Sequence, residues 1–213
     1  GGRREERMGM KLYCFGESGN AYKCALALTL TGQDWEPVFV DFFNGETRSP
    51  AFRALNPMGE VPVLVDGDTV LTQSGVILDY ISSKTGQLGG RSAAERREVL
   101  RWLFWDNHKL STQVGTCRFL ANFLPESKRP EGVIPFLQGR LKAAYTVLND
   151  HLSTRDWIVG DEDGVVSFAH DDVDRLLQAV AITQQHEDAI KAEIATGKRE
   201  QAWLHKVLSA HGL

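Results

Sequence analysis

Cysteines are scarce in this sequence, and their spacing gives no pairing motif. The 213 residues contain three cysteines, Cys14, Cys24 and Cys117, without a C-x-x-C arrangement among them. An odd number without paired spacing argues against a disulfide framework and against a structural metal site, and is typical of a reducing compartment. We therefore expect a cytoplasmic protein that needs no metal.

Long apolar runs and a strong charge of one sign are also lacking. No apolar stretch approaches the roughly 18–20 residues that a membrane-spanning helix needs. The N-terminal stretch GGRREERMGM is charged and lacks the apolar centre of a secretory signal. The formal net charge of −4 argues against nucleic acid as the main partner. We expect neither a membrane nor nucleic acid as a partner, and interpret residues 1–9 as an N-terminal extension or a cloning remnant.

The sequence that follows alternates between strand and helix patterns. KLYCF (11–15) and PVFVDF (37–42) are rich in β-forming residues and predict two strands. Between them, residues 21–31 are apolar on nearly all sides, which predicts a buried helix after a turn that contains Ser18. A strand–helix–strand order requires a crossover connection, so the two strands should be parallel neighbours in one sheet.

A hairpin and a further helix complete this first region. After a polar, broken link with at most a short helix at residues 50–55, VPVLV (61–65) and TVLT (69–72) flank the turn DGD. This pattern predicts an antiparallel hairpin, and residues 75–85 predict a helix capped by Ser74. The sum is βαβ-ββα, an α/β fold with a mixed four-stranded sheet and helices on its faces.

The character of the sequence changes after a Gly-rich stretch, QLGGRS, which we interpret as a linker. Beyond it strand signals nearly vanish. Residues 92–124 and 132–152 have helical spacing, and at least two further helices are expected within 167–213. We therefore predict an α/β domain at residues 10–86 followed by an all-α domain at residues 92–213.

Ser18 is the first candidate for chemistry, because it lies between the first predicted strand and helix. Ligands of open α/β sheets bind beyond the carboxyl ends of strands, where helices present unpaired N–H groups and a positive dipole end. A thiolate would be stabilised there by a hydroxyl donor. Lowering a thiol pKa of about 8.5 by two units requires about 2.7 kcal/mol. The alternative is that Ser18 is only a helix cap.

Two more segments offer similar chemistry. Gln73 and Ser74 precede the helix after the last strand, where a hydroxyl and backbone amides suit a carboxylate; simple capping is the alternative. Val61 and Pro62 stand at the mouth of a strand, where proline is either punctuation or a cis residue that turns the backbone outward to face a ligand. All three segments would surround one site at the same sheet edge.

These positions carry a resemblance to a known family. The motifs are Y-x-x-x-x-S-G-N-x-x-K at Tyr13–Lys23, N-P-x-G-x-V-P at Asn56–Pro62 and L-T-Q-S-x-x-I at Leu71–Ile77. In order and spacing they resemble the cytosolic glutathione S-transferases, most closely a serine-type, theta-like bacterial member. The resemblance implies a thioredoxin-like glutathione-binding domain, an all-α domain that binds an electrophile, a homodimer, and a role in detoxification.

The resemblance also implies roles for individual residues. Val61 would pair its backbone with the cysteinyl unit of glutathione before cis-Pro62. Gln73 and Ser74 would hold the γ-glutamyl end, and Ser18 would activate the sulfur.

Further residues are carried over from the resemblance with alternatives. Asn20 would assist Ser18. Glu60 lies where family members contact the backbone or the glycyl end of glutathione, although an anionic side chain does not suit a carboxylate. Lys23 is a possible counter-charge for glutathione, or else part of a solvated helix face. Tyr13 could replace Ser18 as thiol activator or line the electrophile pocket, with core packing as the alternative.

Trp105 and Asp106 fall on RWLFWDNHK (101–109), which is similar to the first helix of the family's second domain. We expect them to line the electrophile pocket or a dimer seam, with ordinary packing as the alternative. Cys14 and Cys24 are expected to be small core residues. After WIVGD (157–161) the sequence departs from the family pattern.

We therefore predict a glutathione transferase that uses glutathione as co-substrate. Its thiolate would attack a small, soft electrophile. The alternative is a non-catalytic module that binds glutathione or a protein. A thiol–disulfide oxidoreductase, the third reading, would need a cysteine where the sequence has Ser18.

Overall fold

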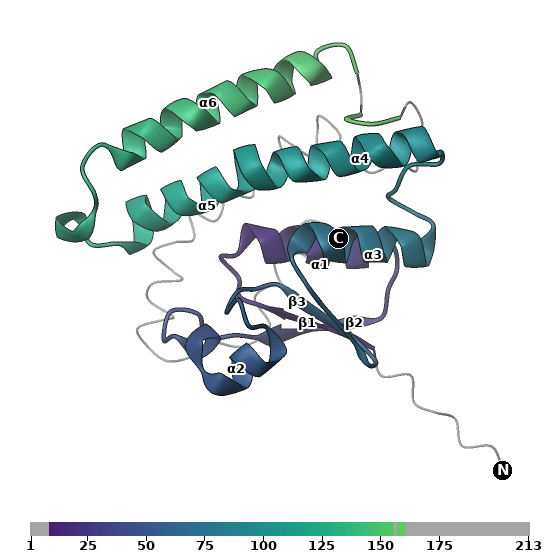
Figure 1. The fold of residues 1–213 in the computed structure, drawn as a ribbon, viewed down its shortest axis with the longest axis horizontal. Coiled ribbons are helices and arrows are strands. Elements are labelled where there is room, and N and C mark those ends of the chain that lie inside the picture. The colour runs from purple at the N-terminus through teal and green to yellow at the C-terminus, as the bar shows by residue number, and fades with distance from the viewer. Residues whose placement is uncertain (1–8, 156, 161–213) are drawn as a thin grey trace. The chain divides into compact units, whose positions relative to one another are not determined.

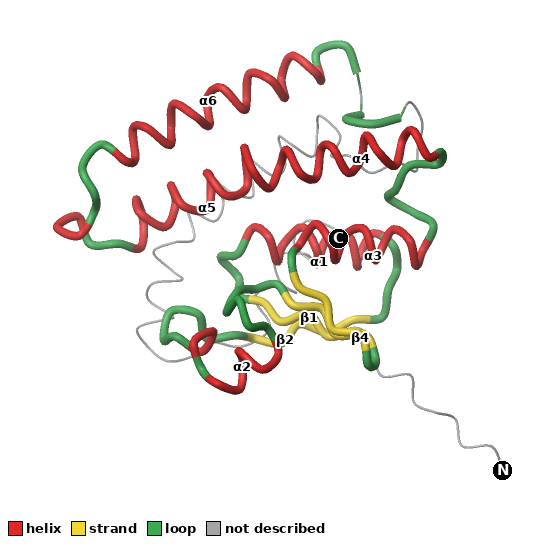
Figure 2. Tube along the Cα trace, in the orientation of Figure 1, coloured by secondary structure: helices red, strands yellow, loops and turns green. Residues whose placement is uncertain are grey.

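The computed structural model describes residues 9–155 and 157–160, which fall into two compact units. The first comprises residues 9–85 and the second begins at Gly86. Figure 1 labels most of the helices and strands of both units, and Figure 2, which also labels β4, colours them by type. The expected helices within 167–213 and the departure from the family pattern after Gly160 lie outside the described residues.

The first unit is built on a four-stranded mixed sheet in the order β2-β1-β3-β4. Its strands are β1 (Met10–Cys14), β2 (Trp35–Phe39), β3 (Val63–Asp66) and β4 (Thr69–Thr72). Strand β1 is parallel to β2 and antiparallel to β3, and β3 and β4 form the hairpin. The predicted βαβ-ββα order and mixed sheet are confirmed (Figure 2).

Strand β2 ends earlier than the sequence suggests. The sequence predicts a strand at 37–42, but β2 spans Trp35–Phe39, because the chain leaves the sheet after Val40 and turns at Asp41–Gly45. The Asp41 carboxylate accepts the side-chain amide of Asn44 at 2.7 Å and so fixes this turn. Pro37 lies inside β2, which is tolerated because β2 is an edge strand with only one neighbour.

Helices cover the sheet. Helix α1 (Gly19–Leu30) and helix α3 (Ser74–Thr85) pack against each other on one face, and the short α2 (Pro50–Leu55) lies on the opposite side (Figure 1). Between the sheet and α1 and α3 lies a fully buried aliphatic core that includes Leu12, Leu28, Leu64, Ile77 and Ile81. Burying each such side chain stabilises the fold by about 1.5–3 kcal/mol.

The described part of the second unit has only helices as regular elements. The predicted helix at 92–124 begins with a capping box between Ser92 and Glu95 and is continuous, but it contains two π-helical segments that the sequence did not predict. Its parts are α4 (Ala93–Trp105), Asp106–Ser111, α5 (Thr112–Arg118) and Phe119–Phe123, and α6 (Val133–Leu152) follows. Among the described helices, none has the length and apolarity to cross a membrane.

A small core around Trp102 holds α4 to α6 and to the loop that follows. Trp102 packs with Leu148, Leu152 and Val159, and its ring lies 4.5 Å from that of His151 between centroids. Within the described residues, this core is centred on one large aromatic ring.

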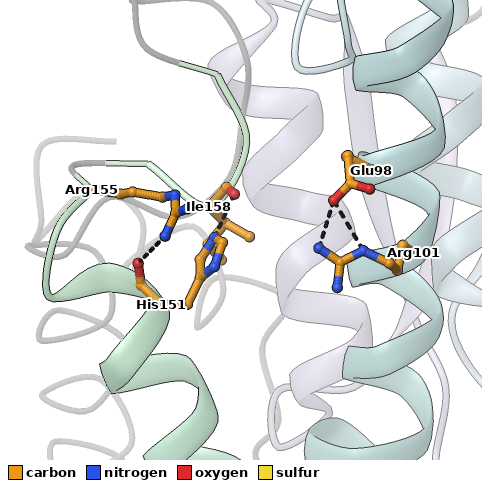
Figure 3. A network of polar contacts seen from close by, with 5 residues as sticks. All are labelled: Glu98, Arg101, His151, Arg155 and Ile158. Carbon is orange, nitrogen blue, oxygen red and sulfur yellow. Dashed lines mark hydrogen bonds and ion pairs between the residues drawn. The ribbon is translucent and has the colours of Figure 1, made fainter.

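Polar contacts tie the end of α6 to the same loop (Figure 3). The Nε2 of His151 lies 2.8 Å from the carbonyl oxygen of Ile158, which can only accept, so Nε2 carries the hydrogen. Arg155 donates to the His151 carbonyl at 3.2 Å. On α4, Arg101 donates to Glu98 at 2.5 and 3.0 Å, which lowers the pKa of that carboxyl.

Candidate ligand site at one edge of the sheet

Strand register brings the three candidate segments to one edge of the first unit. Tyr13 of β1 is paired with Val63 of β3, and Val63 is paired with Thr72 of β4. The carboxyl ends of β1 and β4 therefore meet the amino end of β3. The turn with Ser18, the Val61–Pro62 segment and the Gln73–Ser74 segment directly continue these three strand ends.

Ser18 is the N-cap of α1, as the sequence predicts. Its Oγ accepts the backbone N–H of Ala21 at 3.2 Å, and its own N–H donates to the Phe15 carbonyl at 3.1 Å. The side chain is only half-buried. A hydroxyl that accepts one bond can still donate its own hydrogen, so capping and thiol activation are chemically compatible.

The loop before β3 is fixed by Asn56, a residue that is only 2% exposed. Its amide donates to the Glu60 carbonyl at 2.8 Å, and its side-chain oxygen accepts the Met58 N–H at 3.1 Å. Gly59 has a φ of +68° and lies so close to Thr47 that a Cβ would stand 2.9 Å from the carbonyl oxygen. The loop then reaches the Val61–Pro62 peptide bond, which is cis.

Gln73 connects this loop to the start of α3. Its amide nitrogen lies 3.2 Å from the sulfur of Met58 and 3.4 Å from a carboxylate oxygen of Glu60. Gln73 also has a φ of +68°, a left-handed conformation that is unfavourable for a residue other than glycine. Such conformations persist where the surrounding structure imposes them, and they cluster at functional sites.

Ser74 and Asn20 join the first turns of α3 and α1. The Ser74 hydroxyl donates to the Asn20 side-chain oxygen at 3.3 Å, and the Ser74 carbonyl accepts the thiol of Cys24 at 3.7 Å. The expected cap at Ser74 is wrong by one position, because α3 begins at Ser74 and Gln73 precedes it. The Ser74 side chain bonds to the other helix.

Two other predicted residues, Tyr13 near the end of β1 and Lys23 on α1, have surroundings of their own. Tyr13 packs against the buried cluster of Val40, Phe52 and Val63, which is the core alternative considered for it. Lys23 is half-buried on α1, and its charge lowers the pKa of Cys24, although burial outweighs this effect.

The two buried thiols of the first unit are expected to be unreactive. Cys14 and Cys24 are 4% and 0% exposed, and burial raises the pKa of both thiols to about 12. Thiols with such pKa values remain protonated near neutral pH and are poor nucleophiles. Neither cysteine is suited to a redox role.

Trp105 and Asp106 belong to the second unit and have partners within it. The Trp105 ring lies edge-on to that of Trp102 at 5.2 Å between centroids. The Asp106 carboxylate accepts the Ser111 hydroxyl at 2.8 and 2.9 Å, across the π-helical segment. Both side chains have packing roles of their own, and the electrophile-pocket assignment stays a prediction.

Sequence reasoning missed two features of this edge. Asn56 was noted only as part of a motif; its signal is an asparagine in a turn-forming N-P-x-G stretch. The second feature is an aromatic cluster, in which the Phe15 ring stacks on Phe42 at 4.6 Å and meets Phe43 edge-on at 5.9 Å. No local pattern links phenylalanines so far apart in the sequence.

Comparison with known proteins agrees with this geometry. Residues 8–83 match the family model of the glutathione S-transferase N-terminal domain. Glutathione S-transferase 3 of Zea mays is 34% identical over 160 residues, which is 72% of this chain and 71% of that protein. The chain belongs to the glutathione S-transferase family. The thioredoxin-like fold of its N-terminal unit is thereby confirmed.

Two further relatives show the range of this family. A glutathione transferase from Burkholderia graminis, solved with two glutathione molecules bound per subunit, has a TM-score of 0.67 at 29% identity. The match covers 72% of this chain and 66% of that one. The disulfide-bond oxidoreductase YfcG of Escherichia coli is 28% identical over 166 residues, 73% of this chain and 74% of that protein. Membership in the family therefore does not by itself select a reaction.

Proposed function

We propose that this glutathione S-transferase family member binds glutathione at the sheet edge and transfers it to a soft electrophile. The observation that supports the proposal best is the strand register, which gathers the three motif segments at one edge. Each segment taken alone has a simple capping or turn role. Their meeting at one place is what a tripeptide ligand requires.

The three segments suit different parts of glutathione. The backbone of Val61, two residues before β3, pairs with the cysteinyl unit. The backbone N–H groups of Ser74, Gly75 and Val76 donate to the γ-glutamyl carboxylate. They precede the first intrahelical bond of α3, in which Ile77 N–H donates to the Gln73 carbonyl. The sulfur then lies near Ser18. This arrangement uses backbone groups for binding and one hydroxyl for chemistry.

Ser18 is the proposed catalytic residue of a serine-type transferase. Its hydroxyl donates to the sulfur while its Oγ continues to accept the Ala21 N–H. The positive end of α1 adds to the stabilisation of the thiolate. A hydrogen bond to a charged group contributes about 1.5–3 kcal/mol, enough to lower the thiol pKa by one to two units. Asn20 acts indirectly, because its side chain accepts the Ser74 hydroxyl.

The reaction is a displacement at carbon or an addition to an activated double bond. In displacement on an aryl halide, the sulfur electron pair forms the new C–S bond and halide leaves with its bonding electrons. The thiol proton goes to solvent when the thiolate forms. Catalysis then consists mainly of generating and positioning the thiolate. Within the same proposal, Lys23 offsets the charge of glutathione, and the chain acts as a cytoplasmic homodimer in detoxification. The assignments of Tyr13, Trp105 and Asp106 to electrophile binding remain predictions from the family resemblance.

Isothermal titration calorimetry with glutathione, combined with turnover of an activated aryl chloride, tests the proposal. Binding in the millimolar range or tighter together with conjugation supports it. Binding without turnover would favour the second candidate, a glutathione-binding module, in which Ser18 is only the helix cap that its bond to Ala21 makes it. A disulfide oxidoreductase relying on Cys14 or Cys24 is disfavoured by their burial.

A further inference from the structure

We infer that Glu60, held beside Gln73, is a specificity residue that binds the α-ammonium group of the γ-glutamyl unit. The inference rests on the proposed function and assigns Glu60 to the opposite end of glutathione from the one that the family resemblance implies. Its basis is the meeting of the Glu60 and Gln73 side chains at the sheet edge.

The Glu60 backbone is fixed, while its side chain is exposed. Asn56, which is buried, holds the Glu60 carbonyl at 2.8 Å. The carboxylate extends to Gln73, 3.4 Å from the amide nitrogen, and thus toward the start of α3. The residue is therefore directed at the segment proposed for the γ-glutamyl end.

Among the described residues, the Glu60 carboxylate has a neutral partner and no charged one. Within residues 9–155 and 157–160, its one hydrogen bond comes from the neutral amide of Gln73, and no lysine or arginine pairs with it. A carboxylate accepts bonds at both oxygens, so the second oxygen can receive an ammonium group. A ligand cation here would form a charge-assisted hydrogen bond, which is stronger than a neutral one.

Chemistry separates the two ends of glutathione. The glycyl end carries only a carboxylate, which Glu60 would repel. The γ-glutamyl end carries an α-carboxylate and an α-ammonium group on one carbon. The first-turn amides of α3 suit the carboxylate, and Glu60 with the side-chain oxygen of Gln73 suits the ammonium group. The pair thus recognises an amino acid zwitterion.

The test compares two ligands on two proteins, using the full chain. One ligand is glutathione, and the other is glutaryl-cysteinylglycine, which retains every group except the α-ammonium. Glu60→Gln preserves the shape of the side chain and its contact with Gln73, so folding should be unaffected. Asp68→Asn is the matched control, because Asp68 is an exposed acid in the β3–β4 turn at the other end of the hairpin.

We expect Glu60→Gln to weaken glutathione binding by about fivefold to tenfold, as for an ionic hydrogen bond, while changing the affinity for the analogue less than twofold. Asp68→Asn should change neither. Equal losses for both ligands, or no loss for glutathione, would overturn the assignment of Glu60 while leaving glutathione binding intact. If the unaltered protein binds neither ligand, the proposed function fails and this inference fails with it.

Discussion

The hydroxyl of Ser74 donates to the side-chain oxygen of Asn20 across 3.3 Å, joining two helix starts that are 54 residues apart in the sequence. Ser74 is 6% exposed and Asn20 is half-buried, so this bond is partly shielded from water. It fixes the first turn of α3 relative to that of α1. The proposed sites for the γ-glutamyl carboxylate and for the sulfur lie at these two turns.

Replacing both partners should show that Asn20 and Ser74 act as a pair. We expect Asn20→Ala and Ser74→Ala each to lower the free energy of unfolding by about 1 kcal/mol, with a coupling energy of about 0.5–1.5 kcal/mol in the double variant. Urea denaturation of the unaltered protein, the two single variants and the double variant measures this coupling energy. Additive losses would mean that the two side chains do not stabilise each other.

Removal of the Ser18 hydroxyl should affect turnover far more than binding. We expect Ser18→Ala to lower kcat with an aryl chloride by about 10- to 100-fold, because the bond to the sulfur is lost, and to keep the glutathione Kd within a few-fold. Ser18→Gly controls for the loss of the cap, since glycine caps helices almost as well as serine. Ser18→Thr should retain part of the activity. Equal activity in all variants would refute the role of the hydroxyl.

Gly59 should be intolerant of a side chain. Alanine there would adopt an unfavourable positive φ and place its Cβ 2.9 Å from the Thr47 carbonyl oxygen. We expect Gly59→Ala to destabilise the protein by about 1–3 kcal/mol. Gly75→Ala is the control, because the space around Gly75 is open. Similar urea midpoints for the two variants would contradict this account of the loop.

Thiol reactivity should separate the cysteines. Cys14 and Cys24 have pKa values raised by burial to about 12, whereas Cys117 is half-buried on α5. Near neutral pH we expect a disulfide reagent to leave Cys14 and Cys24 unmodified in the folded protein and to modify all three cysteines after unfolding. Mass spectrometry of the labelled peptides would identify which cysteines are modified in each state. Rapid labelling of Cys14 or Cys24 in the folded protein would contradict this expectation and support the oxidoreductase hypothesis.

The same thiols make stability depend on pH. Burial raises their folded pKa to about 12, above the ordinary thiol value of about 8.5, so their contribution to stability is fully present below about pH 8.5. Above that pH, thiols in the unfolded chain ionise while the buried ones do not, so stability falls as pH rises from about 8.5 toward 12. Cys14→Ala and Cys24→Ala should each reduce the slope of unfolding free energy against pH in this range. An unchanged slope would show that neither thiol is kept neutral by the fold.

Local patterns predicted the strand and helix order and the cap at Ser18, because those depend on neighbouring residues. They missed the π-helical segments around Asp106, because apolar spacing does not distinguish a local i,i+5 turn from an α-helix. The pairing of Glu60 with Gln73 was also beyond sequence reasoning. Glu60 lies in the loop before β3 and Gln73 directly follows β4, and only the pairing of these strands brings them together.

The pKa of the sulfur of bound glutathione tests the central claim most directly. It is measured by the ultraviolet absorbance of the thiolate as pH is varied, with glutathione in excess over its Kd, in the unaltered protein and in Ser18→Gly. The account predicts a pKa about one to two units below the ordinary value of about 8.5, and a return toward that value in the variant. An unshifted pKa in the unaltered protein, or the same shift in both proteins, would contradict it.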